Sequence, residues 1–581
     1  MREVNETINC DVLVVGGSLA GCSAAIAAKE TLGSDSRIVV VDKAKTSRSG
    51  QSPFAAGIYT VFDPQEDDLQ QWMEEIVSTG EYLNDQLWCQ QLFEHSFRVA
   101  NNIDTWGQSY GKVVFVRDEN GRILRRRSRG HIHTRHNVIN SLQMMDTLRR
   151  KMVEVGVKIV DRVMVTDLLG AENGVRGALG LSYWDDRTLS FKSKATVLSA
   201  SGCGFKSIFL GHRNLTGDLL AAAFDVGARF AGMEQFHTNT GCKDYDIHGL
   251  NLYVGVGGRF LNGLGEEFMW RYHPVLGNRA RLQDLVLSFC REVQEGRGPI
   301  YMDITRASEA DEALCRAILP ESFRLWDRAG VSPFKQKVEW VPSFKGTTAS
   351  GGGIKVNLKC ESNVPGLYGA GDLTWIAPHG TYSFGGINIG YTAVSGDLAG
   401  RHAAAFARET KESGEVSRTE IKEILTRRMI SLKNVRGISP EEAVDQIQRA
   451  IIPYEVSYLK TPASIARAQQ RMEEIEGEIL PQVRSGSSHE LVKAIEANSM
   501  VKVAKMMLAA SLVREESRGF HHRVDFPLTD NEKWLKRVIL QNDGRGGLDI
   551  TTEQVETPYV QPKEAYSSPP GTPVEERRQA S

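Results

Sequence analysis

The chain has 581 residues, which is too long for one hydrophobic core and predicts roughly three to four domains. Its 70 Lys and Arg residues nearly balance its 72 Asp and Glu residues, so net charge gives no field that would recruit nucleic acid or an anionic membrane. The eight cysteines include no C-x-x-C pair, which excludes a local zinc knuckle or iron–sulfur cradle, and no metal site is predicted.

The first ten residues are polar and acidic, without the apolar core of a secretion signal. No run of 18 apolar residues follows anywhere in the chain, so no membrane span is expected. Scattered thiols are typical of a reducing compartment. A cytoplasmic location is therefore predicted.

Residues 11–42 predict a dinucleotide-binding unit. A buried strand, a Gly-rich turn, a helix of small residues and a second strand follow one another at 11–15, 16–21, 22–29 and 37–41. Gly16 permits the tight turn, Gly21 lets the helix pack on the strand, and Asp42 lies where an acid binds a ribose hydroxyl. Ser18 replaces the middle glycine of G-x-G-x-x-G, which weakens the motif. A plain βα turn is the alternative, but the register of both strands with Asp42 favours a ligand.

The loop 43–58 is rich in small and polar residues, which would let a flat ring system approach the backbone; a solvent loop is the alternative. From here the chain resembles the flavoprotein family of fumarate reductases, succinate dehydrogenases, aspartate oxidases and adenylylsulfate reductases. Members with covalently attached FAD have a histidine after an Arg-Ser pair, where this sequence has Gly50 after Arg48 and Ser49. The resemblance therefore implies FAD held without a covalent bond.

An arginine cluster follows at residues 122–129, with five arginines in eight residues. Such a run could bind phosphate or carboxylate groups in a bidentate manner. A solvated surface or a partner-docking patch is the preferred interpretation. Nucleic-acid binding is not predicted, because interleaved aromatic residues and a recognisable nucleic-acid fold are missing.

Three later segments resemble cofactor-binding segments of the same family. Residues 199–204 resemble its Ala-Thr-Gly-Gly turn, 216–218 its Thr-Gly-Asp-Gly segment, and 364–372 the return strand that ends in an acid at the ribityl chain. The 216–218 segment could equally be an ordinary helix cap. A helix that begins at Asn388 and Ile389 would direct its positive dipole end at the flavin.

The inserted segment 236–344 resembles the family's capping domain. Its likeness rests on residues 258–272, on the Glu-Gly-Arg-Gly segment at 295–298 and on the Tyr-Met-Asp sequence that follows. These features occur in the family's order. The resemblance implies a domain that closes over the flavin.

The chemistry departs from the dicarboxylate enzymes at three positions. The residue before Asp284 is Gln283 where an arginine carries the proton, residues 348–353 lack the family's histidine, and Ser383 stands where an arginine clamps a carboxylate. Each lost charge-assisted bond would cost a ligand about 1.5–3 kcal/mol. Fumarate and succinate are therefore disfavoured as substrates.

The candidate catalytic residues are His237, Arg281 and His379. His237 matches the family's Gln-Phe-His-Pro position, Arg281 could replace the missing arginine, and Tyr382 could also project into the site. A histidine is the natural acid or base near neutral pH. A structural histidine is an equally good interpretation of either one.

The C-terminal third predicts a small helical bundle. Ser417 and Glu420 form a capping-box pattern before apolar residues at helical spacing, and 500–513 has another apolar face. Residues 516–527 resemble the family's Ser-Arg-Gly-Ala-His signature. Pro, Ser, Thr and charged residues dominate beyond Asn542, which predicts an extended or disordered tail.

Together these segments predict an α/β fold: a split Rossmann-type FAD-binding domain with an inserted α+β capping domain and a C-terminal helical bundle. The expected domains are the two parts of the FAD-binding domain (1–235 and 345–405), the capping domain (236–344), the helical domain (406–524) and an extended C-terminal tail (525–581). The residues expected to contact FAD are Gly16, Ser18, Ala20, Gly21, Asp42, Lys43, Ser49, Gly50, Ala56, Gly57, Val163, Ala200, Ser201, Gly202, Asp218, Gly371, Asp372, Asn388 and Ile389.

The resemblance implies an FAD-dependent oxidoreductase that passes hydride or electron pairs between a small, non-dicarboxylate substrate and a redox partner. Without clustered cysteines, any iron–sulfur relay would lie on a separate ferredoxin-like subunit, and peripheral association with a membrane redox complex is left open. The alternatives are an adenylylsulfate reductase α-like subunit, an oxygen-using oxidase, and a non-catalytic electron-relay subunit.

Overall fold

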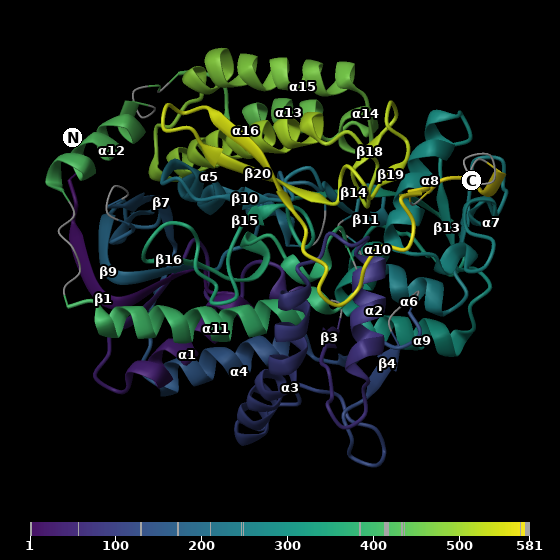
Figure 1. The fold of residues 1–581 in the computed structure, drawn as a ribbon, viewed down its shortest axis with the longest axis horizontal. Coiled ribbons are helices and arrows are strands. Elements are labelled where there is room, and N and C mark those ends of the chain that lie inside the picture. Colours follow the sequence, from purple (N-terminus) through teal and green to yellow (C-terminus); the bar gives the residue numbers. More distant parts are fainter. Residues whose placement is uncertain are drawn as a thin grey trace.

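The computed structural model describes residues 3–575 except 56, 128–130, 171–173, 209–210, 246, 248, 383–384, 412–416, 431–433, 435 and 570. At 427–430 it describes the backbone alone. Figure 1 shows three regions: a sheet with its helices around the N-terminal strand, a helical layer above it, and a third region beside both.

The N-terminal strand β1 lies inside a seven-stranded sheet of order β6-β2-β1-β9-β8-β7, with β16 also beside β9. β6, β2, β1, β9 and β16 run parallel, and β8 runs antiparallel to both of its neighbours, β9 and β7. The strands are β1 (Glu6–Val15), β2 (Ile38–Asp42), β6 (Lys158–Asp161), β7 (Val163–Leu169), β8 (Gly177–Ser182), β9 (Thr188–Leu198) and β16 (Leu367–Gly369). Because β16 comes from far along the chain, the prediction of a split domain is confirmed.

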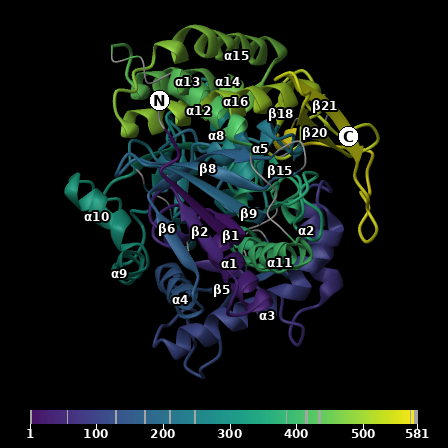
Figure 2. The ribbon, with the colours of Figure 1, turned by 90° about the vertical axis from the view of Figure 1, so that its left-hand side faces the viewer.

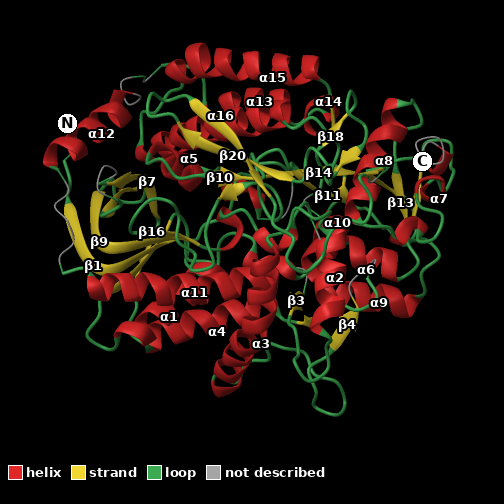
Figure 3. Cartoon of the chain, viewed as in Figure 1, coloured by secondary structure: helices red, strands yellow, loops and turns green. Residues whose placement is uncertain are grey.

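Helices α1 (Leu19–Leu32) and α11 (Ile387–Glu409) run side by side against this sheet (Figure 3). Glycines make the approach possible: a Cβ at Gly400 would lie 2.2 Å from the Ala24 carbonyl oxygen, and one at Gly396 would lie 2.4 Å from that of Ala20. The predicted first helix exists but begins earlier, at Leu19, and β1 begins earlier, at Glu6.

The remaining helices of this region are α2 (Leu69–Thr79), α3 (Gln86–Ser109), α4 (Ser141–Glu154) and α5 (Asp218–Asp225). The arginine cluster contributes to a three-stranded sheet of β3 (Ile58–Thr60), β5 (Arg135–Val138) and β4 (Arg125–Arg127). Arg125 forms ion pairs with Asp67 and with Glu66, the latter at 3.0 Å, while Arg126 and Arg127 are exposed. Arg129 lies outside the described residues.

The inserted segment forms its own four-stranded antiparallel sheet of order β11-β14-β13-β12. Its strands are β11 (His237–Cys242), β12 (Arg259–Leu261), β13 (Tyr301–Asp303) and β14 (Val338–Gly346). Its helices are α6 (Leu250–Gly255), α7 (Met269–Tyr272), α8 (Leu282–Gln294), α9 (Glu309–Ile318) and α10 (Pro320–Arg328). The expected α+β capping unit is therefore present; its exact boundaries stay predictions.

The helical layer contains α12 (Arg418–Ile430), α13 (Pro440–Ile451), α14 (Tyr454–Ser457), α15 (Pro462–Glu474) and α16 (Ser488–Val513). Helices α13, α15 and α16 pack on one another, and α16 also packs on α5 (Figures 1 and 2). Within the described part of the chain, every helix is too short or too polar to span a membrane.

Part of the expected tail belongs to a sheet. Strand β20 (Lys536–Asn542) pairs with β10 (Phe230–Ala231), which pairs with β15 (Gly353–Ile354), and β21 (Leu548–Gln554) pairs with β20 on its other side. Val538 and Leu540 are fully buried. Short pairs of β17 (Leu459–Lys460) with β18 (His522–Arg523), and of β19 (Thr529–Asp530) with β22 (Tyr566–Ser567), complete the C-terminal region. The chain after residue 525 is thus folded onto the body as far as β22.

Candidate cofactor and substrate site

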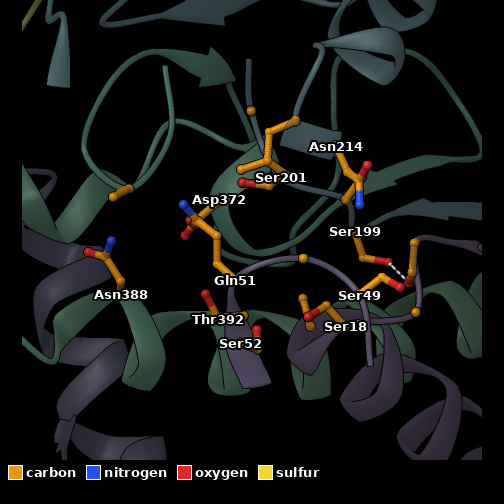
Figure 4. Close-up of a pocket in the computed structure, with 18 of the residues that line it drawn as sticks. Ser18, Ser49, Gln51, Ser52, Ser199, Ser201, Asn214, Asp372, Asn388 and Thr392 are labelled. Carbon is orange, nitrogen blue, oxygen red and sulfur yellow. Dashed lines mark hydrogen bonds between the residues drawn. The ribbon is translucent and has the colours of Figure 1, made fainter. Parts of the chain in front are cut away.

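A cavity lies where the parallel strands of the main sheet end (Figure 4). Its lining includes Val15 from the end of β1, Asp42 from the end of β2, the turn 199–202 after β9 and Asp372 just after β16. Ligands of open parallel sheets bind outside the carboxyl ends of the strands. The position of this cavity therefore fits the predicted cofactor site.

The glycine turn before α1 has the geometry that the sequence motif predicts. Gly16 has φ +105°, and a Cβ there would lie 2.6 Å from the Ala200 backbone nitrogen. A Cβ at Gly21 would lie 1.8 Å from the Gly16 carbonyl oxygen. Ser199 donates a hydrogen bond of 2.9 Å to the same oxygen. The turn and the end of β9 therefore approach as closely as backbone atoms allow.

Asp42 fixes this turn through both carboxylate oxygens. One accepts from the Gly17 backbone N–H and the other from that of Ala44, each at 2.7 Å. Burial raises the pKa of Asp42 above its ordinary value. Asp42 lines the cavity, so a ribose hydroxyl would meet a carboxylate that already holds two backbone amides.

The cavity brings together most of the residues expected to contact FAD: Gly16, Ser18, Ala20, Asp42, Lys43, Ser49, Gly50, Val163, Ala200, Ser201, Gly202, Asp218, Asp372, Asn388 and Ile389. Gly21, Gly57 and Gly371 lie outside its lining. Gly371 has φ +69°, and a Cβ there would meet the Ala20 side chain at 2.9 Å. Gly371 therefore lets the turn after β16 pack closely against α1. Ala56 lies outside the described residues.

Lys43 and Asp218 form an ion-pair network at the wall of the cavity. The Lys43 ammonium lies 2.7 Å from Asp218 Oδ2 and 2.8 Å from Glu496 Oε1, and it donates to Thr216 Oγ1 at 2.8 Å. Burial opposes the charge on Lys43, but the two carboxylates prevail and raise its pKa. This network joins the sheet to α5 and to α16.

Two hydroxyl groups of the lining are placed to bind a ligand. Within the described structure, Ser18 Oγ and Ser201 Oγ are buried without a hydrogen-bond partner. They lie on the turn before α1 and on the turn after β9, two neighbouring turns that both line the cavity (Figure 4). A buried hydroxyl without a partner is costly. The hydroxyl and phosphate oxygens of FAD would satisfy both, so the residues present fit this cofactor.

Asp372 and the first turn of α11 form the opposite part of the lining, as Figure 4 shows for Asp372 and Asn388. Burial raises the pKa of Asp372 to about 6. Asn388 Oδ1 is hydrogen-bonded to His379 Nε2. Helix α11 starts after Gly386, whose φ is +97°. Its N-terminal dipole favours negative charge at this end of the cavity.

The two candidate histidines lie behind Tyr382, which lines the cavity, but do not line it themselves. The His379 ring stacks on the Tyr382 ring at 5.0 Å, and the His237 ring meets it edge-on at 5.3 Å. His237 Nδ1 is hydrogen-bonded to Ser350 Oγ. Burial lowers the pKa of His379 to about 4 and that of His237 well below its ordinary value. Both rings are therefore neutral at pH 7, and their catalytic roles stay predictions.

Arg281 also lies outside the cavity lining. Its Nε lies 3.2 Å from Asp284 Oδ2. Burial lowers the pKa of Arg281, but Asp284 and Glu81 outweigh it and raise the pKa. Arg281 thus stays charged and bound to an acid, and its proposed role as a proton carrier is likewise only predicted.

Two of the positions that differ from the dicarboxylate enzymes serve the local structure. Gln283 Nε2 donates to the Tyr382 carbonyl oxygen at 2.8 Å, and Thr348 Oγ1 donates to the Lys345 carbonyl oxygen at 2.9 Å. Ser383 lies outside the described residues. Neither Gln283 nor Thr348 supplies a cation to a ligand.

Sequence reasoning missed several polar residues of the lining, among them Asn214, Asn239, Asn251 and Lys345. The last three come from β11, α6 and β14 of the inserted segment. Lys345 left a signal that could have been noticed, because it is a lysine among buried residues at the end of a strand. The asparagines left none.

Comparison with known families gives two matches. The family described as FAD binding domain matches residues 11–389, and the family described as Fumarate reductase flavoprotein C-term matches residues 448–567. The first match spans the glycine turn, the inserted segment and the start of α11. The second spans most of the helical layer and the β20–β21 hairpin.

Curated relatives match over nearly the whole chain. The CoM/CoB fumarate reductase subunit of Methanothermobacter marburgensis is 27% identical over 556 residues, which cover 92% of this chain and 98% of that protein. The 8-methylmenaquinol:fumarate reductase flavoprotein subunit of Wolinella succinogenes is 26% identical over 589 residues, covering 94% and 91%.

Solved structures show the same fold. A variant of Escherichia coli quinol fumarate reductase FrdA superimposes with a TM-score of 0.86 at 22% identity, covering 96% of this chain and 99% of that one. An adenosine-5-phosphosulfate reductase in complex with sulfite gives 0.79 at 18% identity, covering 95% and 97%. At these identities the likeness establishes the architecture alone.

Proposed function

Because this chain belongs to the FAD binding domain family and is an FAD-dependent oxidoreductase of the fumarate reductase and succinate dehydrogenase flavoprotein type, we propose that it acts on a small substrate other than a dicarboxylate. When bound, FAD accepts or gives up a hydride or an electron pair. The protein holds the coenzyme, orients the substrate and excludes water.

The charge of the cavity lining carries this proposal. In the described lining, the cations are Lys43 and Lys345. The Lys43 ammonium is already bound to the carboxylates of Asp218 and Glu496. A dicarboxylate needs two charge-assisted contacts, each worth about 1.5–3 kcal/mol. The names of the fumarate reductase relatives state what those proteins act on. In the described lining of this chain, Lys345 is the one cation besides Lys43, which is fewer than a dicarboxylate requires.

We propose further that FAD is held without a covalent bond. Among the described residues that line the cavity, none is a histidine or a cysteine, whose imidazole or thiol would be the nucleophile for a covalent link. Gly50 lies in the lining, where its missing side chain leaves space: a Cβ there would meet only Ser18 Oγ, at 3.9 Å.

The proposed redox partner is a separate ferredoxin-like iron–sulfur subunit. The eight cysteines are all buried and dispersed, and no cluster of metal-binding side chains occurs in the part of the chain that the structure describes. An electron relay beyond FAD would therefore need a second chain. Copurification from the native host tests this, and full turnover by the isolated flavoprotein would contradict it.

The decisive experiment is an anaerobic spectral titration. Purified protein should show a flavin absorption spectrum, and acid precipitation should release the yellow colour into the supernatant. Small monocarboxylic acids and sulfur compounds are then tested for bleaching of the spectrum. Bleaching by succinate alone, or reoxidation of the reduced flavin by fumarate alone, would refute the substrate class. Hydrogen peroxide release in air would favour an oxygen-using oxidase.

A further inference from the structure

We propose that Lys345 is the anion-binding residue of the substrate site, and that the substrate is a small organic acid held through a single anionic group. This inference rests on the proposed function, because it assumes that the cavity holds FAD and a substrate together. Lys345 is a positively charged residue outside all of the sequence motifs described above.

The position of Lys345 in the fold is the first argument. It lies near the end of β14, its side chain lines the cavity, and the residue is 8% exposed. The next residue, Gly346, has φ +59°, and a Cβ there would lie 2.1 Å from the Cys203 carbonyl oxygen. The end of β14 is thus fixed against the main sheet, which holds Lys345 in place.

The neighbours of Lys345 in the lining are the second argument. The inserted segment supplies two amides from other elements, Asn239 on β11 and Asn251 on α6. The Asn239 side-chain oxygen accepts from the Thr240 backbone N–H at 2.8 Å, so its amide N–H groups are the part of this side chain that would donate to a ligand. In the described lining this segment contributes no carboxylate. Its chemistry is that of an anion site.

The charged and titratable groups around Lys345 are the third argument. They are Asp372 after β16, His237 on β11 and His212 after β9. Burial, and then the Lys345 charge, lower the pKa of both histidines well below the ordinary value. Both rings are therefore neutral at pH 7. Burial lowers the pKa of Lys345 to about 8, against the carboxylate of Asp372, so its ammonium is the cation of this region.

The two lysines of the lining differ in what they bind. The Lys43 ammonium joins Asp218 and Glu496 in a structural network that links three elements. Lys345 faces the single carboxylate of Asp372, the neutral rings of His237 and His212, and the amides of the inserted segment. One cation at the substrate end matches one anionic group, and an anion bound there would raise the pKa of Lys345.

The test uses the FAD-loaded protein and two probes of equal shape, crotonate and its neutral amide, crotonamide. Binding is read from the perturbation of the flavin spectrum. Crotonate should bind wild type and lose affinity above about pH 8, as Lys345 gives up its proton. K345M should weaken crotonate about 10- to 100-fold and leave crotonamide unchanged, and K345R should restore binding and move the pH limit upward.

The matched control is K460M. Lys460 is buried as well, and burial lowers its pKa to about 7, but it lies outside the cavity lining. K460M should bind crotonate as wild type does. Equal crotonate affinity in K345M and wild type overturns the inference, as does a loss of crotonamide binding to the same degree.

Two further readouts distinguish this role of Lys345 from a dicarboxylate site and from a role at the flavin. Fumarate binding about tenfold or more tighter than crotonate would reveal a second cation and overturn the single-anion class. A lowered flavin midpoint potential in K345M with unchanged crotonate affinity would place Lys345 at the flavin instead. If purified protein takes up no FAD, the proposed function fails; if it is yellow and K345M binds crotonate normally, only the role of Lys345 fails.

Discussion

Gly21 shows how little space the cofactor turn leaves. The hydrogen atom that replaces its side chain lets α1 begin directly over the Gly16 carbonyl oxygen, and a methyl group there would overlap it. Overpacking costs about 1–3 kcal/mol, and here the displaced atoms belong to the ligand-binding turn. We expect G21A to lower FAD affinity about tenfold or more, measured by equilibrium titration of the apoprotein with FAD.

The control for Gly21 is Gly255, which ends α6 and has no atom within 4 Å of an added Cβ. G255A should keep full FAD affinity and the wild-type melting temperature. Equal FAD affinity of G21A and G255A would contradict the role assigned to the turn.

Asp372 gives the site a dependence on pH. Its carboxyl group is buried and has a pKa of about 6. If the ionised form accepts hydrogen bonds from the cofactor, binding favours the deprotonated state, so FAD affinity falls as the pH drops below about 6. We expect D372N to bind FAD weakly at every pH and without this dependence. Flavin fluorescence titrations from about pH 5 to about pH 8 measure both, and a flat wild-type profile would exclude Asp372.

At the scale of elements, the contact between α1 and α11 couples the two halves of the split domain. Gly400 of α11 lies against the Ala24 carbonyl oxygen of α1, so a methyl group at position 400 would force the helices apart. G400A should lower the free energy of unfolding by about 1–3 kcal/mol and weaken FAD binding, because α11 carries Asn388. Chemical denaturation measures the first effect.

Gly477 provides the comparison for Gly400. It lies in the helical layer and has no atom within 4 Å of an added Cβ. G477A should unfold at the wild-type denaturant concentration or slightly above it. If G400A behaves in the same way, close helix packing does not hold the two halves together.

Elements with a local signal were predictable. The apolar runs around Val12 and Val39 predicted β1 and β2, and Gly16 with Asp42 predicted the turn between them. The pairing of β20 with β10 was not predictable, because β10 has only two residues and lies about 300 residues earlier in the chain. Lys345 could be noticed as a lysine at the end of a strand, but its burial depends on packing between distant segments and was not predictable.

At the scale of the whole molecule, a buried charge network joins the helical layer to the rest. Arg514 Nε lies 2.8 Å from Glu234 Oε1, and Arg514 also pairs with Glu516 at 2.5 Å. Lys460 lies beside Glu234, with its ammonium 4.4 Å from the centroid of the Phe236 ring. Burying such pairs adds little stability, while breaking one costs several kcal/mol. The network therefore specifies how the layers meet.

Lys460 makes the stability of the protein depend on pH. Burial lowers its pKa from 10.5 in the unfolded chain to about 7 in the folded one. Between these values the unfolded state binds more protons, so the free energy of unfolding rises with pH across this window. We expect K460M to show a smaller rise. Urea unfolding at several pH values measures it, and equal slopes for K460M and wild type would contradict it.

The late arrival of β16 has a consequence for synthesis. Strand β9 is made early, but the edge of residues 196–198 stays open until residues 367–369 emerge from the ribosome. An open strand edge invites pairing with other chains. During much of its translation, the growing polypeptide therefore has an incomplete coenzyme site and an unpaired strand edge that favours aggregation. Chaperones that cover this edge would increase the fraction of newly made protein that folds and binds FAD.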